Sequence, residues 1–224
     1  MPSTRPVSNP LALAVLSSLW ERPMYPYEIT TTLRERGKED SIRLNFGSLY
    51  AVIKSLEKHG LIRAAATERE GNRPERIVYA ITDAGRRETD EWLRELLSEP
   101  TKEYPAIETA LSLITMLPPD EALALLRTRV AKLTTDIDDR EARGSDPETA
   151  RLPELFLVEY WFKLAMLRAE RDWLADLADR IESGTIGDLE LWKQMHELLA
   201  SGASMEDVAA RLEDHLGEGR PTES

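Results

Sequence analysis

The stretch that decides the fold is NFGSLYAVIKSLEKHGLIRAAATEREGNRPERIVYAITD, residues 45–83. Leu49, Val52, Ile53 and Leu56 recur at the spacing of one buried face of a helix. Asn45 has the side chain of an N-cap, because its oxygen can accept a hydrogen bond from an amide of the first turn. Gly60 suits the position just after a helix end. The first part of the stretch is therefore predicted to be a short amphipathic helix.

Two strands joined by a charged turn are predicted after this helix. Leu61-Ile62 opens the first strand, and residues 77–81 are rich in β-branched and aromatic side chains. Between them, Gly71-Asn72 supplies turn chemistry and Pro74 suits an edge or a loop. A helix followed by such a hairpin is typical of a winged helix, in which the helix can enter a DNA groove and the hairpin can touch the backbone beside it.

The outer face of the predicted helix carries the candidate DNA contacts. Tyr50 stands among polar neighbours, and its hydroxyl could reach a phosphate or a base edge together with Ser48 and Lys54. The alternative is that Tyr50 packs against a neighbouring helix. Three arginines of the wing could also face phosphates, although glutamates are interspersed with them and a charged loop is usually only solvated. These arginines are Arg69, Arg73 and Arg76.

Helices are also predicted on both sides of this stretch. Asn9-Pro10 caps and starts the first, a second runs from about residue 27 to 36, and Thr82-Asp83 caps a further helix over about 84–98. Helix, helix, helix, strand, strand is the order of a winged helix-turn-helix domain.

Four motifs in this order and spacing resemble the PadR family of bacterial transcriptional regulators. The motifs are YPYEI at 25–29, FGSLY at 46–50, LEKHGLI at 56–62 and YAITDAG at 79–85. Family members usually carry Gly where Pro26 stands and Pro where Ala51 stands. The resemblance covers roughly residues 10–90. It implies a homodimeric, usually repressing DNA-binding protein whose C-terminal helices dimerise and sense a small molecule. We expect the DNA-binding residues to be Tyr27, Asn45, Ser48, Tyr50, Lys54, Arg69, Arg73 and Arg76.

The C-terminal half is predicted to be entirely helical. Helices are expected over about 106–117, 121–143 (capped by Asp120), 153–183, 188–201 and 204–215. Residues 155–167 are apolar nearly all round, and a helix of this kind is buried on all sides. A small helical domain has little core for that, so we expect a second subunit to cover it. The predicted dimerisation residues are Leu126, Val130, Leu133, Leu157, Trp161 and Leu164.

Aromatic side chains of this half could also wall an effector pocket at a subunit or domain junction. Plain core packing is the alternative, since no set of polar groups identifies a ligand. The expected effector is small and either hydrophobic or aromatic, and the residues that could bind it are Trp92, Tyr160, Trp161 and Trp173.

Composition argues against several other classes. No apolar run is long enough for a membrane span, the N-terminus has no signal-peptide core, and there is no cysteine. The three histidines lack metal-ligand spacing, and no phosphate-binding glycine loop or nucleophile elbow is present. We therefore expect a cytoplasmic protein that is not an enzyme and that has no cofactor, metal site or membrane partner.

The net charge of −12 is the main argument against DNA as a partner, because it repels a polyanion. Residues 1–87, however, hold 14 Lys and Arg against 10 Asp and Glu, whereas residues 101–224 hold 14 against 26. This asymmetry suits a mildly basic DNA-binding domain joined to an acidic C-terminal half. We expect a transcriptional regulator that reads a palindromic operator in double-stranded DNA. The alternative is a winged-helix module that binds proteins.

The expected fold class is mainly α, with an N-terminal winged helix-turn-helix of three helices plus a two-stranded wing and an all-α C-terminal dimerisation domain. The expected domains are a disordered N-terminus (1–8), the DNA-binding domain (9–98), a linker (99–105), the helical dimerisation and effector domain (106–216) and a disordered tail (217–224).

Overall fold

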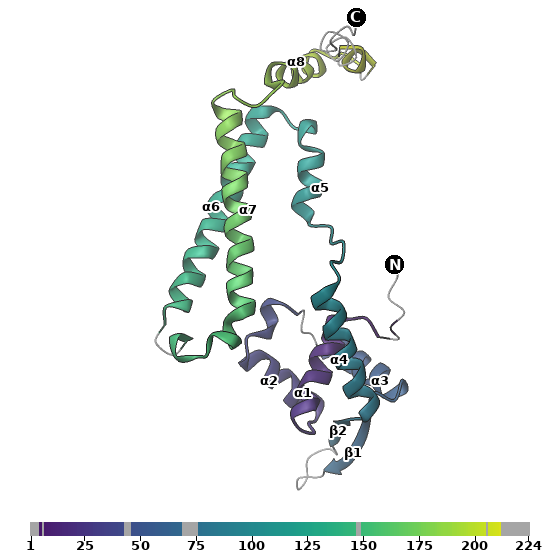
Figure 1. Cartoon of the computed structure of the whole chain (residues 1–224). Coiled ribbons are helices and arrows are strands. Elements are labelled where there is room, and N and C mark those ends of the chain that lie inside the picture. Colours follow the sequence, from purple (N-terminus) through teal and green to yellow (C-terminus); the bar gives the residue numbers. More distant parts are fainter. Residues whose placement is uncertain are drawn as a thin grey trace, which may run out of the picture. The chain divides into compact units, whose positions relative to one another are not determined.

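The computed structural model describes residues 5, 7–42, 46–68, 76–146, 149–204 and 206–211 (Figure 1). It divides into two compact units, Met1–Glu103 and Tyr104–Ser224, and the boundary falls inside the segment predicted as a linker. The tail predicted at 217–224, and most of the N-terminal segment predicted at 1–8, lie outside the described residues.

The N-terminal unit contains three helices, a hairpin and a fourth helix. The helices are α1 (Pro10–Glu21), α2 (Pro26–Glu35), α3 (Phe46–Lys58) and α4 (Asp83–Ser98), with a short 3-10 turn, η1 (Lys38–Asp40), after α2. The strands are β1 (Ile62–Glu68) and β2 (Arg76–Ile81). This order confirms the predicted winged helix-turn-helix.

The predicted apolar stripe of α3 faces the core. Leu49, Val52, Ile53 and Leu56 are all buried, and they join one cluster with residues of α1 and α2. The first helix begins where the sequence predicted, because the Leu11 amide donates a hydrogen bond of 2.9 Å to the Asn9 side chain. Burial of one stripe leaves the other side of α3 to solvent, and this side carries the candidate DNA contacts.

The hairpin is antiparallel and is tied to the start of α2. Its register runs from Ile62 opposite Ile81 to Glu68 opposite Arg76, with an irregularity between Ala64 and Ala66. Met24, in the connection between α1 and α2, pairs with Tyr79: the Met24 amide donates to the Tyr79 carbonyl at 3.0 Å, and the Tyr79 amide donates back at 2.9 Å. The N-terminus of α2 therefore lies directly beside β2.

Helix α4 is anchored at its first turn. The Gly85 amide donates to the Thr82 hydroxyl oxygen at 3.0 Å, and this hydroxyl lies 2.7 Å from the Gly60 carbonyl oxygen. A Cβ on Gly85 would come within 2.1 Å of the Leu61 carbonyl oxygen, far inside any normal contact. This position therefore requires glycine for close packing of the helix on the chain that enters β1.

The C-terminal unit is built on a long helical hairpin. Its helices are α5 (Ala106–Ser112), α6 (Pro119–Gly144), α7 (Val158–Glu182) and α8 (Leu189–Ala200), with 3-10 turns η2 (Ile114–Met116), η3 (Thr149–Arg151) and η4 (Glu154–Leu157). Helices α6 and α7 lie side by side in Figure 1. They run antiparallel, because Ile137 near the end of α6 packs against Leu164 near the start of α7.

Three local expectations for this unit need correction. Helix α6 is capped by Pro118 rather than Asp120, because Pro119 occupies the first helical position, where its fixed φ is favourable. Residues 106–117 form α5 and η2 instead of one helix, and residues 154–157 form the 3-10 turn η4 before α7 begins. Within the part of the chain that the structure describes, no helix is long and apolar enough to cross a membrane.

Candidate nucleic-acid interface

Tyr50 and Lys54 lie on the solvent side of α3. Tyr50 keeps 58% of its surface exposed, and Lys54 is exposed one helical turn further on. Residues four apart are neighbours on a helix surface, so the phenol and the ammonium group share one face. Ser48 is half-buried near the start of the same helix. The predicted contact residues of α3 are therefore presented together, and Tyr50 is not packed away against a neighbouring helix.

A cavity of about 410 Å³ connects α3 to α2 and β2. Tyr50 reaches it from α3, Tyr27 from the first turn of α2, and Arg76 from the start of β2. Three predicted DNA-binding residues, far apart in sequence, thus meet in one place. The full lining is Tyr25, Pro26, Tyr27, Tyr50, Arg76, Ile77 and Tyr79.

Arg76 is held at this cavity by an aromatic ring. Its guanidinium carbon lies 5.1 Å from the centre of the Tyr25 ring, within the range of a cation–π contact. A restrained guanidinium loses less conformational entropy when it binds an anion than a freely rotating one does. The cavity therefore combines phenol hydroxyls with a cation that a neighbouring ring restrains.

The electrostatics of the cavity are not wholly favourable to a phosphate. Burial raises the pKa of the Tyr79 hydroxyl above its usual value, with further contributions from the charge of Glu57 and from Tyr50. Tyr79 stays protonated at neutral pH and can donate a hydrogen bond. Glu57 lies on the exposed side of α3, so its carboxylate opposes any anion that approaches this surface.

Among the tyrosines that line the cavity, sequence reasoning missed two, Tyr25 and Tyr79. The available signals were the pair of tyrosines on either side of Pro26 and the two-residue spacing of Ile77 and Tyr79, which puts both on one face of a strand. Three predicted DNA-binding residues, Asn45, Arg69 and Arg73, lie outside the described residues.

Comparison with known proteins identifies this unit. The model of the transcriptional regulator PadR-like family matches residues 15–91. Most of the N-terminal unit therefore resembles this family, and we call the unit the PadR-like domain. No protein with a curated function matches the chain.

Solved structures of PadR-type regulators share the fold of most of the chain. Bacillus subtilis PadR in complex with operator DNA is 21% identical, with a TM-score of 0.59, 77% of this chain covered and 99% of that chain. The same regulator in complex with p-coumaric acid is 20% identical, with a TM-score of 0.58 and coverage of 77% and 98%. The PadR-like regulator BC1756 from Bacillus cereus is 16% identical, with a TM-score of 0.53 and coverage of 78% and 99%.

Of the four residues expected to bind an effector, Trp92 lies in the N-terminal unit and the other three lie on α7 of the C-terminal unit. Trp92 belongs to the PadR-like domain, where it is buried and the Arg5 guanidinium carbon lies 5.4 Å from its ring centre. Tyr160 and Trp161 contact each other edge to face in α7, with ring centres 4.9 Å apart. Trp173 lies about 20 Å further along that helix at 1.5 Å per residue.

Two of the three predicted effector residues on α7 have a defined local environment. The Tyr160 hydroxyl donates a hydrogen bond to the Arg140 carbonyl of α6, so part of this side chain serves to hold the hairpin together. Trp173 is 55% exposed and borders a cavity of about 280 Å³ together with Ile107 and Leu111 of α5. Trp173 therefore lies beside an apolar cavity of the helical unit.

The residues predicted for dimerisation fall into two groups. Leu126 and Leu164 are 6% and 1% exposed and pack inside the protomer, so other side chains carry the surface that a second subunit could cover. Val130, Leu133 and Leu157 are half-buried, and Trp161 is exposed. The start of α7 and the turn before it carry further exposed apolar side chains: Leu155, Phe156, Val158, Phe162 and Met166.

Proposed function

We propose that this protein is a sequence-specific DNA-binding transcriptional regulator. In this proposal it acts as a homodimeric repressor at a palindromic operator and is released by a small hydrophobic or aromatic effector. The single observation that carries the DNA-binding part is the convergence of Tyr27, Tyr50 and Arg76 on one cavity at the exposed side of α3. The complex of Bacillus subtilis PadR with operator DNA supports the same assignment by likeness of fold.

The side chains of this surface suit the backbone of DNA. Phosphate oxygens accept hydrogen bonds from tyrosine hydroxyls, lysine and arginine, and such contacts fix the protein on the duplex. Lys54 and Ser48 lie on the helix that would enter the major groove, where base edges can be read. We therefore assign Tyr27 and Arg76 to the phosphates, and Ser48, Tyr50 and Lys54 to the groove.

The exposed apolar side chains around the start of α7 support a homodimer. Leu155, Phe156 and Phe162 each keep most of their surface in contact with water in the single protomer. A contiguous apolar surface of this kind favours association, because soluble monomers rarely leave one uncovered. Two copies related by a two-fold axis would present two α3 helices to successive major grooves and read a palindrome.

The effector part rests on the Bacillus subtilis relative and on Trp173. That relative has been solved with p-coumaric acid, and here Trp173 borders an apolar cavity in the helical unit. A ligand that binds more tightly to the conformation that cannot bind DNA would shift the population away from the operator.

A mobility shift with DNA from upstream of the protein's own gene, at two salt concentrations, tests the function. We expect specific binding that weakens with salt. If Lys54 contacts the DNA backbone, Lys54→Ala should reduce the slope of log affinity against log salt by about one. If Lys54 contacts a base instead, the variant should discriminate less between operator sequences. Lys132→Ala, which removes an exposed lysine of α6, is the matched control and should bind as the parent does. The absence of any shift at low salt would support the alternative, a module that binds proteins.

A further inference from the structure

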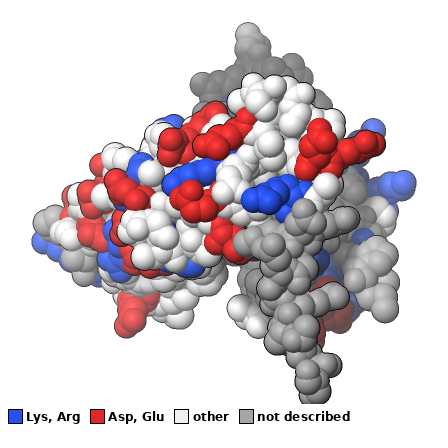
Figure 2. Space-filling model, turned by 90° about the horizontal axis from the view of Figure 1, so that it is seen from above, with Lys and Arg blue, Asp and Glu red and all other residues white. Residues whose placement is uncertain are grey.

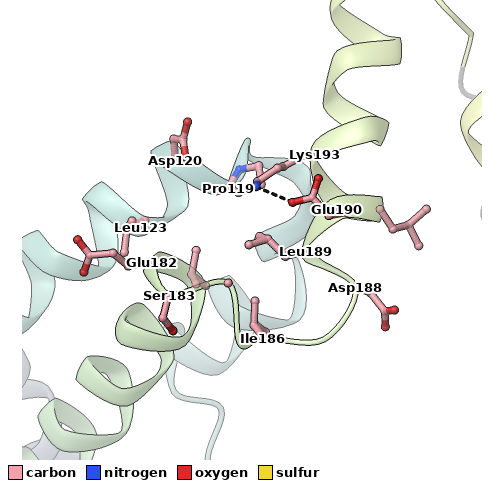
Figure 3. A pocket seen from close by; sticks show the side chains of 13 residues that line it. Pro119, Asp120, Leu123, Glu182, Ser183, Ile186, Asp188, Leu189, Glu190 and Lys193 are labelled. Carbon is pink, nitrogen blue, oxygen red and sulfur yellow. Dashed lines mark hydrogen bonds and ion pairs between the residues drawn. The ribbon is translucent and has the colours of Figure 1, made fainter.

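The end of the helical hairpin contains a second, larger cavity that the proposed DNA binding does not use. It measures about 800 Å³ and lies between the start of α6, the end of α7 and the start of α8 (Figure 3). Its volume falls in the range of pockets that hold small organic ligands, about 300–1,000 Å³. All of its walls belong to the C-terminal unit, so its shape does not depend on how the two units are arranged.

The base of this cavity is apolar and continuous with the core. Ile181 and Leu189 are buried members of the cluster that joins α6, α7 and α8, and Leu123 and Ile186 pack against the same cluster. Helix α8 is fixed there by two polar contacts. The Trp192 indole N–H donates to the Leu117 carbonyl at 2.9 Å, and His196 lies 2.9 Å from the Thr115 carbonyl. The apolar base is thus preformed for a hydrophobic body.

The edge of the cavity carries mostly carboxylates. Asp120 comes from α6, Glu182 from α7, and Asp188 and Glu190 from the start of α8, all around the hollow in Figure 3. One basic residue, Lys193, lines it among the described residues. More widely, Figure 2 shows basic side chains interspersed with acidic ones on the described part of the face seen from this end.

The carboxylates that line the cavity outnumber the lysine that lines it with them. Glu182 is paired with Arg127, whose guanidinium also contacts Asp179. Asp120, Asp188 and Glu190 lie at helix N-termini, each of which contributes about half a positive charge, so the two helix ends together offset about one carboxylate. Lys193 offsets another. The C-terminal carbonyls of α7 add negative charge, which leaves the edge of the cavity net negative.

The ammonium group of Lys193 shows where the edge of the cavity binds a positive charge. Its Nζ lies 2.7 Å from a carboxylate oxygen of Glu190, as the dashed line in Figure 3 shows. The Glu190 hydrogen bond raises the pKa of Lys193, and the charges of Asp120 and Glu197 act in the same direction. A ligand cation that replaced this ammonium group would find the same carboxylates.

We propose that the cavity between α6, α7 and α8 binds an amphipathic organic cation, whose apolar body lies on Leu123, Ile186 and Leu189 and whose positive charge lies between Asp120 and Glu190. Such a ligand would bridge α8 to the end of the hairpin. None of Trp92, Tyr160, Trp161 and Trp173 lines this cavity, and ligand binding there does not require the proposed DNA binding.

Isothermal titration calorimetry of the full-length protein with two matched probes tests this site. Tetraphenylphosphonium and tetraphenylborate share four phenyl groups around one central atom and differ in the sign of their charge. We expect the phosphonium to bind at least about tenfold more tightly than the borate, because the edge of the cavity attracts one and repels the other. Equal or tighter binding of the borate would overturn the proposal.

Three variants locate the site. Glu190→Gln and Asp120→Asn should each weaken phosphonium binding about two- to fivefold, the size of a solvent-screened charge pair. Lys193→Met should strengthen it by a similar factor, because it removes the competing ammonium group. Glu206→Gln changes an exposed residue that does not line the cavity, and it is the control.

If the phosphonium bound all four variants as it binds the parent, its binding site would be elsewhere, such as on the apolar surface of α7, and the proposal would be wrong. Since the titration contains no DNA, its failure would leave the proposed DNA binding untouched.

Discussion

Replacing Phe162 by alanine should dissociate the proposed dimer without unfolding the protomer. Phe162 lies on α7 with 67% of its surface exposed in the single chain. The neighbouring core positions Leu164 and Leu167 are buried against α6 and keep the hairpin together in the variant. The substitution therefore removes apolar surface that only a second subunit would cover.

The expected size of the effect follows from this exposed fraction. Full burial of a phenylalanine contributes about 1.5–3 kcal/mol, so covering the exposed two thirds contributes about 1–2 kcal/mol in each subunit. A two-fold interface contains the residue twice, which makes the loss about 2–4 kcal/mol per dimer. At about 1.4 kcal/mol for each factor of ten, the dissociation constant should rise about 30- to 1,000-fold.

Sedimentation equilibrium over a wide range of protein concentration measures this constant. Leu199→Ala, which removes an exposed leucine from α8, is the matched control and should leave the constant unchanged. Circular dichroism should show the same helix content in all three proteins. Two results would refute the reasoning: a parent protein that is monomeric at micromolar concentration, or a Phe162→Ala dimer as tight as the parent.

Three further predictions concern the PadR-like domain and the helical hairpin. Gly85→Ala should destabilise the protein by about 1–3 kcal/mol in urea denaturation, because the new Cβ overlaps the Leu61 carbonyl, whereas Gly187→Ala meets no atom within 4 Å and should be nearly neutral. Glu57→Gln should tighten operator binding about two- to fivefold in a mobility shift, because it removes a carboxylate whose charge acts on Tyr79. Unchanged binding would place the DNA away from the cavity that Tyr79 lines. Glu91→Gln, at an exposed position of α4, is the control. Leu164→Ala should cost about 2–5 kcal/mol of stability by leaving a cavity between α6 and α7, and a loss below 1 kcal/mol would contradict the packing described for that pair.

The local elements of the PadR-like domain could be predicted because their signals are local. The stripe from Leu49 to Leu56 lies within about two helical turns, and Asn9 and Thr82 cap helices in their own immediate sequence. Tyr50 and Lys54 could be placed on one face for the same reason. The family motifs added the expected functional role, and the matched segment 15–91 confirms that resemblance.

The cavity at α3 could not be predicted because a long-range pairing creates it. Tyr25 and Tyr79 come together only because the Met24 backbone pairs with β2. The helical hairpin posed a different difficulty. Where residues 155–167 are nearly all apolar, no periodicity distinguishes the side that packs on α6 from the side left exposed. Leu164, a predicted dimerisation residue, is 1% exposed in the single protomer.

The pairing of Met24 with Tyr79 also constrains the length of the connection between α1 and α2. The Met24 backbone is held against β2, and Tyr25 and Tyr27 follow it directly in the chain. The position of Met24 therefore determines where both tyrosines lie relative to β2. One residue inserted after Met24 would move either Met24 out of its pairing with Tyr79 or both tyrosines away from Arg76. The connection between α1 and α2 should therefore tolerate changes of residue type far better than changes of length.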